Sequence, residues 1–211
     1  MTTAIIGTGV LGSAIARELA SGGESLRLSN GDTAAARKLA AELGPGTVVA
    51  TDNRDALQGA GAVVLALRFV ALQGVIDEIA DALSDEVVVV PSNPLTTDAH
   101  GKVVRVLPAD QSSGEVVTGW LPAGAHLAMA FGTLSVDLLV SSSRRSPDPA
   151  VLFYATDDER ATSEVERLIR TAGFVPAKIG GVGASDRLEV GGDLHDLVVG
   201  PSDVRSALHH G

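Results

Sequence analysis

The sequence predicts an α/β protein whose doubly wound, mainly parallel sheet of the Rossmann type carries a small C-terminal α/β annex. Two observations predict this class. Short β-branched runs alternate with helical patterns over the first 95 residues, as expected where crossover helices join parallel strands. Runs 62–67 and 87–90 are apolar at every position, which is typical of strands that are covered on both faces.

The elements of the first half follow from this alternation. Asp32 is a suitable N-cap for the second helix, which Gly44-Pro45 ends. We expect strands at 3–7, 25–29, 48–50, 62–67 and 86–91, with helices at 10–21, 32–43 and 72–83.

The second half is less regular. Residues 92–112 form a polar segment that predicts a long loop, and Ser112 with Glu115 forms a capping box for a short helix toward Trp120. Beyond it we expect strands or buried segments at 126–131 and 135–140, a β-α-β unit at 151–155, 158–171 and 173–178, and a last helix at 185–199. We place a domain boundary after residue 134, giving a Rossmann domain at 1–134 and an annex at 135–211.

Bulk composition excludes several classes of function. The net charge is −10 and no basic stripe is present, so nucleic acid is not an expected partner. The absence of cysteine excludes disulfides and thiolate chemistry. No apolar stretch reaches ~18 residues and no leader pattern opens the chain, so we expect a cytoplasmic protein that does not enter membranes. The five histidines lack a metal-binding spacing, and we expect no metal.

Residues 7–12 read Gly-Thr-Gly-Val-Leu-Gly, a G-x-G-x-x-G pattern between a predicted strand and a predicted helix. In such a loop the first glycine allows a tight turn, the second lets the backbone approach a pyrophosphate, and the third lets helix and strand pack closely. Amides at the helix N-terminus then bind the pyrophosphate. The alternative is a glycine turn without a ligand. The predicted cofactor-binding residues of this loop are Gly7, Thr8, Gly9, Val10, Leu11 and Gly12.

The end of the second predicted strand bears on the choice of cofactor. NAD-binding proteins place an acidic residue about twenty positions after the loop, whereas this chain has Ser29-Asn30. A hydroxyl and an amide can donate to a 2′-phosphate, so we expect NADP (NADPH). Asp32 counts against a dianion, and a simple turn is the alternative role for Ser29-Asn30.

Further cofactor contacts are expected after the fourth and fifth strands, because ligands of open α/β sheets lie outside the carboxyl ends of the strands. Leu67-Arg68 and Asn93-Pro94 occupy these positions. The alternatives are a solvated arginine and an Asx-Pro turn. Residues 131–133 are candidates for the hydride path, with a core segment followed by a turn as the alternative. Residues 142–145 are a candidate for contact with an anionic acceptor tail, but a solvated loop is the preferred interpretation. No catalytic acid–base pair is evident, so no catalytic residue is assigned.

Residues 4–12 resemble the start of the F420-dependent NADP oxidoreductase family, and segments 92–95, 129–134, 153–158 and 185–189 are similar to later family landmarks in the same order. The resemblance covers nearly the whole chain. It implies a homodimer that transfers a hydride between NADPH and coenzyme F420. The chain departs from the family pattern at Asn30, where members that bind NADP carry arginine, and at Gly132, where members carry a side chain.

We therefore expect an NADPH-dependent oxidoreductase acting on F420 or a related flavin-like small-molecule acceptor. One alternative is a reductase of a quinone or small carbonyl compound, which for a carbonyl needs a proton donor. Another is a non-catalytic Rossmann protein that senses NADP(H).

Overall fold

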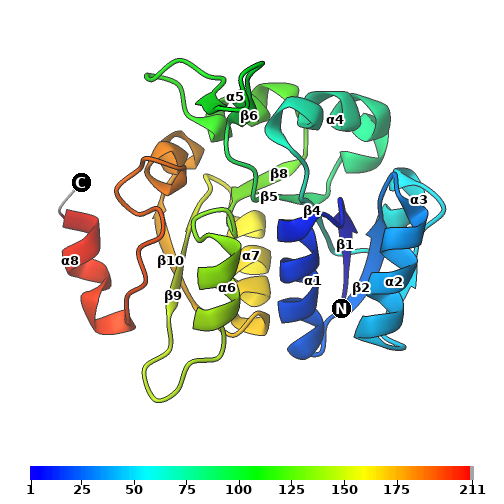
Figure 1. Cartoon of the computed structure of the whole chain (residues 1–211), viewed down its shortest axis with the longest axis horizontal. Helices are drawn as coiled ribbons and strands as arrows, with labels where there is room; N and C mark the ends of the chain where they lie inside the picture. The colour runs from blue at the N-terminus through cyan, green and yellow to red at the C-terminus, as the bar shows by residue number, and fades with distance from the viewer. Residues whose placement is uncertain (210–211) are drawn as a thin grey trace.

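The computed structural model describes residues 1–209 and contains one eight-stranded sheet with the order β10-β9-β8-β5-β4-β1-β2-β3 (Figure 1). Strands β1 to β5 and β8 are parallel, and β9 runs antiparallel to β8 while pairing in parallel with β10. The strands are β1 (Thr2–Ile6), β2 (Ser25–Ser29), β3 (Thr47–Val49), β4 (Ala62–Leu65), β5 (Val87–Val90), β8 (His126–Met129), β9 (Val151–Ala155) and β10 (Val175–Gly180). The predicted doubly wound Rossmann class is confirmed.

Helices flank both faces of the sheet (Figure 1). The helices are α1 (Val10–Ser21), α2 (Thr33–Leu43), α3 (Asn53–Leu57), α4 (Phe69–Leu83), α5 (Ser113–Trp120), α6 (Val136–Ser142), α7 (Glu159–Thr171) and α8 (Val204–His209). Two 3-10 helices, η1 (Val182–Leu188) and η2 (Pro201–Asp203), precede α8. None of the described helices is long and apolar enough to cross a membrane.

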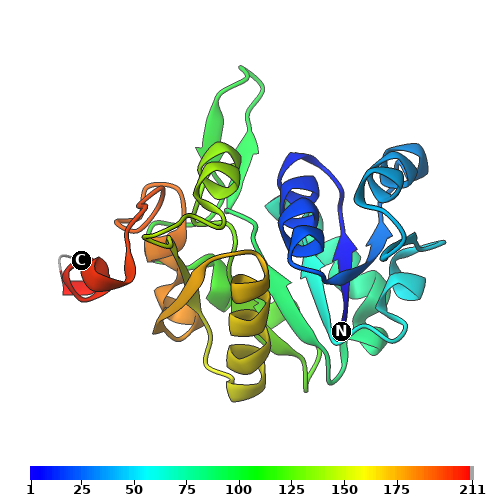
Figure 2. The same cartoon turned by 90° about the horizontal axis from the view of Figure 1, so that it is seen from below.

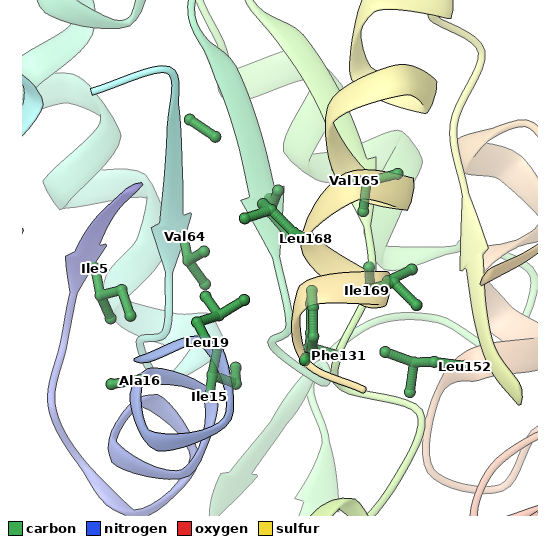
Figure 3. Close-up of a cluster of buried hydrophobic side chains, with 14 of the residues drawn as sticks. Ile5, Ile15, Ala16, Leu19, Val64, Phe131, Leu152, Val165, Leu168 and Ile169 are labelled. Carbon is green, nitrogen blue, oxygen red and sulfur yellow. The ribbon is translucent and has the colours of Figure 1, made fainter. Parts of the chain in front are cut away.

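Alternate strand positions divide the core into two clusters. Ile5 and Val64 face a cluster with α1, α2, α6 and α7, whereas Ile6 and Val63 face a cluster with α3, α4 and α5. Figure 3 shows side chains of α1 and of α7 meeting in the first cluster, in which both helices are buried against the same sheet. Because β9 and β10 extend this sheet, residues on both sides of position 134 share one core. The division at 134 stays a prediction about separable units.

Three predictions for the second half, at 92–112, 135–140 and 185–199, differ from the structure. The predicted loop 92–112 contains a hairpin, β6 (Leu95–Thr97) with β7 (Val103–Arg105), which projects from the body (Figure 2). Asp98 closes its turn, since the carboxylate accepts from the amides of His100 and Lys102. Segment 135–140, predicted as a strand or buried segment, belongs to α6.

The predicted helix at 185–199 is wrong. The chain makes η1, then turns, and Glu189 is already extended. Gly191 has φ +96°, and a Cβ at Gly192 would lie 2.4 Å from the Arg187 carbonyl oxygen. The two glycines therefore allow the turns that follow η1 and do not continue a helix over 185–199. By contrast, the Asp32 cap of α2 and the Ser112–Glu115 capping box of α5 are both confirmed.

Candidate functional site

The glycine loop joins β1 to α1 at the carboxyl edge of the sheet, and two of its glycines are required by close backbone contacts. Gly7 has φ +96°, and a Cβ there would lie 2.4 Å from the Ala66 carbonyl oxygen. A Cβ at Gly12 would lie 1.9 Å from the Gly7 carbonyl oxygen. The Gly7 amide donates to the Ser29 carbonyl over 2.8 Å, which ties the loop to the end of β2. The first and third glycines therefore serve the packing roles that the pattern predicts.

Gly9 is different, because no atom lies within 4 Å of the position that a Cβ would take. It is the N-cap of α1 and supplies no side-chain cap, so protein side chains leave the first amides of the helix open. Ser13 supports the loop from behind, its hydroxyl donating to the Thr8 carbonyl over 2.9 Å. The Thr8 hydroxyl is buried and has no hydrogen-bond partner within residues 1–209. Open amides, an unpaired hydroxyl and free space at Gly9 together fit a phosphate group.

Three polar residues, Ser29, Asn30 and Asp32, lie at or just after the end of β2. Two of them already form hydrogen bonds through their side chains. Ser29 is buried, and its hydroxyl donates to Asn53 Oδ1 over 2.7 Å. Asp32 accepts from the amides of Ala34 and Ala35, so the N-terminus of α2 is already capped by a carboxylate. Asn30 is half-buried and makes no side-chain hydrogen bond within residues 1–209. Of the two predicted phosphate ligands, Asn30 is thus the one whose side chain remains available.

The other predicted cofactor residues continue from the glycine loop along the carboxyl edge of the sheet. We call the glycine loop together with Leu67, Arg68, Asn93 and Pro94 the arc. Leu67 lies beside Gly7, with its Cδ2 atom 2.9 Å from the position of a Gly7 Cβ. The Ser92 hydroxyl donates to the Leu67 carbonyl over 2.5 Å, which joins the loops that follow β4 and β5. Arg68 is exposed at the N-cap of α4 and forms no ion pair in the described chain.

Asn93 occupies the centre of this arc and is held at both ends of its amide. Its Nδ2 donates to the Gly132 carbonyl over 3.0 Å, and its Oδ1 accepts from the Val190 amide over 2.7 Å. The side chain therefore ties the segments after β5, β8 and η1 together, and the geometry supports a positioning role better than a direct cofactor contact. Pro94 is buried at the base of the β6–β7 hairpin, where its carbonyl accepts from Val106.

The loop after β8 has a constrained backbone. Phe131 is fully buried with φ +67°, a conformation that non-glycine residues rarely adopt. A Cβ at Gly132 would lie 2.0 Å from the Pro91 carbonyl oxygen. Gly132 is therefore required by the close approach of the segments that follow β5 and β8. The departure from the family pattern at this position has a packing cause.

A small pocket lies where β5 and β8 end, and the sequence did not predict all of its wall. The segments after the two strands form one side, as expected for an open α/β sheet. The start of α5 and the end of η1 form the other, and Ser113, Ser185 and Glu189 were not predicted as site residues. The pocket is lined by Val90, Pro91, Ser92, Asn93, Ser113, Met129, Ala130, Gly132, Thr133, Ser185, Leu188 and Glu189.

Glu189 is the one titratable residue in the lining of this pocket. The side chain is 5% exposed; Oε2 pairs with Arg105 and Oε1 accepts from the Ser113 amide over 2.7 Å. Both carboxylate oxygens are thus engaged by donors at the start of α5. The carboxylate holds η1 against α5 and is not placed as a proton donor. No cluster of three or more potential metal ligands occurs within residues 1–209.

Segment 142–145 does not support the predicted contact with an acceptor tail. Arg144 donates to the carbonyls of Glu18 and Thr171 over 2.6 and 2.7 Å. These carbonyls end α1 and α7, so the arginine lies at the opposite end of α1 from the glycine loop. The guanidinium caps two helix C-termini, a structural role for a cation.

Comparisons with known proteins agree with this architecture. Residues 2–94 match the model of the family described as NADP oxidoreductase, coenzyme F420-dependent, which confirms the predicted resemblance over that range. The chain is similar to the structure of a hypothetical protein from Sinorhizobium meliloti, at 27% identity and a TM-score of 0.82 over 95% of both chains. No curated protein sequence matches the chain.

Two further structures share the fold at lower identity. A candidate F420-dependent NADP reductase from Arthrobacter sp. has 22% identity and a TM-score of 0.74, over 88% of this chain and 89% of that one. An imine reductase from Bacillus cereus has 17% identity and a TM-score of 0.63, over 88% of this chain and 56% of the reductase. The chain thus spans little more than half the length of the imine reductase.

Proposed function

We propose, with the family match over residues 2–94 as premise, that this chain is an NADPH-dependent oxidoreductase. It transfers a hydride between NADP(H) and coenzyme F420 or a related flavin-like acceptor. The observation that carries the proposal is the glycine loop, in which backbone contacts fix Gly7 and Gly12 while Gly9 faces open space. A loop that served packing alone would not require free space beside open helix amides and an unpaired buried hydroxyl at Thr8.

Each part of the arc has a place in this function. The amides at the start of α1 and the Thr8 hydroxyl bind the pyrophosphate, and Arg68 reaches toward the same anion from α4. Asn30 donates to the 2′-phosphate at the end of β2. Asn93 and Gly132 hold the pocket beyond them, where the nicotinamide end belongs. NADPH, when bound, supplies the hydride.

The pocket favours a ring acceptor over a simple carbonyl compound. Reduction of a carbonyl requires a proton donor beside the oxygen, and Glu189 already accepts from Arg105 and Ser113. Hydride transfer to a flavin-like ring depends mainly on proximity and stacking. Val90, Met129 and Leu188 give the pocket an apolar lining.

The test is a titration of the purified chain with NADPH and NADH, followed by NADPH oxidation with F420, FMN and a panel of quinones. We expect tighter binding of NADPH and faster oxidation with F420 or FMN. Tight binding with no acceptor accelerating oxidation would support the NADP(H)-sensing alternative. Absence of binding to either dinucleotide would contradict the whole proposal.

Asn30→Arg tests the assignment of the 2′-phosphate site. A guanidinium binds phosphate through two parallel hydrogen bonds, so NADPH affinity should rise about tenfold relative to NADH affinity. Asn30→Gln is the control, because it keeps a neutral amide. An unchanged NADPH/NADH ratio in Asn30→Arg would show that the phosphate lies elsewhere.

The proposal includes a cytoplasmic homodimer. Sedimentation equilibrium measures whether the purified chain is a monomer or a dimer.

A further inference from the structure

The pocket at the ends of β5 and β8 contains an unpaired polar group that the proposed function does not use. Ser113 lines this pocket and is fully buried at the first turn of α5. Its amide donates to Glu189, but its hydroxyl has no hydrogen-bond partner in the part of the chain that the structure describes. A buried hydroxyl without a partner is unfavourable and is rare in native structures.

The position of this hydroxyl points to a ligand. Three buried side-chain atoms within residues 1–209 lack a partner: Thr8 Oγ1, Ser113 Oγ and His195 Nδ1. Thr8 belongs to the glycine loop, and Ser113 lines the pocket at the other end of the arc. The contacts from Gly7 through Leu67 and Ser92 join the two places along one edge of the sheet.

The charges around the pocket limit the ligand group to a neutral one. No lysine or arginine lines the pocket, and Glu189 is an unfavourable neighbour for a second anion. A cationic ligand group would gain little electrostatic stabilisation from Glu189, because Arg105 already pairs with this carboxylate. Ser185 differs from Ser113, because its Oγ already accepts from the Gly114 amide over 2.9 Å. What remains is a hydroxyl that can donate to a neutral oxygen.

The pocket rim is also fixed before any ligand binds. Asn93 bridges the Gly132 carbonyl and the Val190 amide, and the strained Phe131 directs the chain into Gly132. A rim held by hydrogen bonds and by an unfavourable backbone conformation is typical of a preorganised site.

We propose that this pocket is a subsite for a neutral carbonyl group, which accepts a hydrogen bond from the Ser113 hydroxyl. The inference rests on the proposed function and deepens it. Two sources carry this chemistry: the carboxamide of the nicotinamide, and a ring carbonyl of the flavin-like acceptor. Ser113 is thus a specificity-determining residue that adds to the glycine loop and Asn30.

The test compares Ser113→Ala with Ser141→Ala. Ser141 is a matched control, because it lies exposed on α6 and its hydroxyl donates only to backbone carbonyls of its own helix. Three quantities are measured for each variant: the Kd for NADPH, the Kd for 2′-phospho-ADP-ribose, which lacks the nicotinamide, and the KM for the acceptor.

If the carboxamide is the source, Ser113→Ala weakens NADPH binding about fivefold or more and leaves binding of 2′-phospho-ADP-ribose unchanged. If the acceptor is the source, the KM for the acceptor rises by a similar factor and both Kd values stay the same. Without ligand, Ser113→Ala should be at least as stable as the wild type, because the substitution removes an unpaired buried hydroxyl. Loss of binding with no loss of stability is the signature of a ligand contact.

Unchanged constants in Ser113→Ala, with normal NADPH binding by the wild type, would overturn the subsite alone and indicate that water occupies the pocket. Equal losses for NADPH and 2′-phospho-ADP-ribose would overturn it too, because the effect would then not depend on the nicotinamide. Failure of the wild type to bind NADPH would overturn both the subsite and the proposed function.

Discussion

The glycine loop in the amino-terminal half of the sheet and the pocket wall in the half that follows β5 are held by contacts of different range. In the loop, the Ser13 hydroxyl donates to the Thr8 carbonyl five residues earlier. In the second half, the shape of the chain depends on bonds between distant residues. The Ser113 amide reaches Glu189, 76 residues away, and the Val190 amide reaches Asn93, 97 residues away. The cofactor loop lies in the first half and the pocket wall in the other.

This difference separates two tasks. A dinucleotide loop needs a fixed backbone curve, which glycines provide locally. A pocket for a second group needs walls from several segments, and long-range hydrogen bonds align them. We expect substitutions in the glycine loop to perturb one element of the fold. Substitutions at residues that bridge distant segments, such as Asn93, should perturb several elements.

The largest effect is expected for Gly12→Ala. The new Cβ would lie 1.9 Å from the Gly7 carbonyl oxygen, so α1 or the loop must move. We expect a loss of about 3 kcal/mol in the free energy of unfolding, as for severe overpacking, together with loss of NADPH binding. Urea unfolding and fluorescence titration measure the two effects.

Gly74→Ala is the control for that variant. Gly74 is an exposed glycine in α4, and no atom lies within 4 Å of the position that its Cβ would take, so alanine should stabilise the helix by up to about 1 kcal/mol. Equal stability of Gly12→Ala and the wild type would show that the loop does not need its third glycine.

The sequence predicted the elements of the amino-terminal half of the sheet better than those that follow β5. The bounds of α1 and β2 were predicted correctly, because the spacing of their apolar residues and the glycines beside them are local signals. The β6–β7 hairpin and the turns after η1 were missed although Asp98 and Gly191 act locally. The polar composition of 92–112 predicted a loop, and the pattern of 185–199 predicted a helix. Ser113 was not predicted as a site residue, since only the fold brings it to the ends of β5 and β8.

The next effect in size is expected for Asn93→Ala. The substitution leaves the Gly132 carbonyl and the Val190 amide without their partner. We expect a loss of about 2 kcal/mol, the net contribution of two hydrogen bonds at about 1 kcal/mol each. Asn30→Ala, at a residue whose side chain forms no hydrogen bond within the described chain, should stay within about 0.5 kcal/mol. If the two variants unfold at the same urea concentration, Asn93 does not tie the segments together.

Tyr154→Phe should have a smaller effect that depends on pH. The buried Tyr154 hydroxyl donates to Glu166 Oε1 over 2.7 Å, and this bond, with a second from Arg170, lowers the pKa of Glu166. A carboxylate with a lowered pKa adds stability above its ordinary value of about 4.3, and that stability is lost as the pH falls through the folded-state pKa.

We therefore expect Tyr154→Phe to cost about 1 kcal/mol near neutral pH, and less as the pH falls through the lowered pKa of Glu166 in the folded state. Unfolding curves at several pH values measure the difference. A difference that grows as the pH falls would contradict the assigned hydrogen bond.

The smallest effect on stability is expected for Arg68→Ala. Arg68 is exposed at the start of α4 and unpaired within residues 1–209, so its removal should change stability by less than about 0.5 kcal/mol. If the guanidinium contacts a cofactor phosphate, NADPH affinity falls about tenfold. Arg37→Ala, on the exposed face of α2, is the comparison, and an equal change in both variants would remove Arg68 from the site.

The most direct test of the central claim is the NADPH affinity of Gly9→Ala. Gly9 has φ −68°, which alanine can adopt, and the new Cβ meets no protein atom within 4 Å. The free energy of unfolding should fall by less than about 1 kcal/mol, the usual cost of alanine at an N-cap. The methyl group occupies the space proposed for the pyrophosphate, so the Kd for NADPH should rise at least tenfold, or about 1.4 kcal/mol. An unchanged Kd in this folded variant would contradict the assignment of the loop as a dinucleotide site.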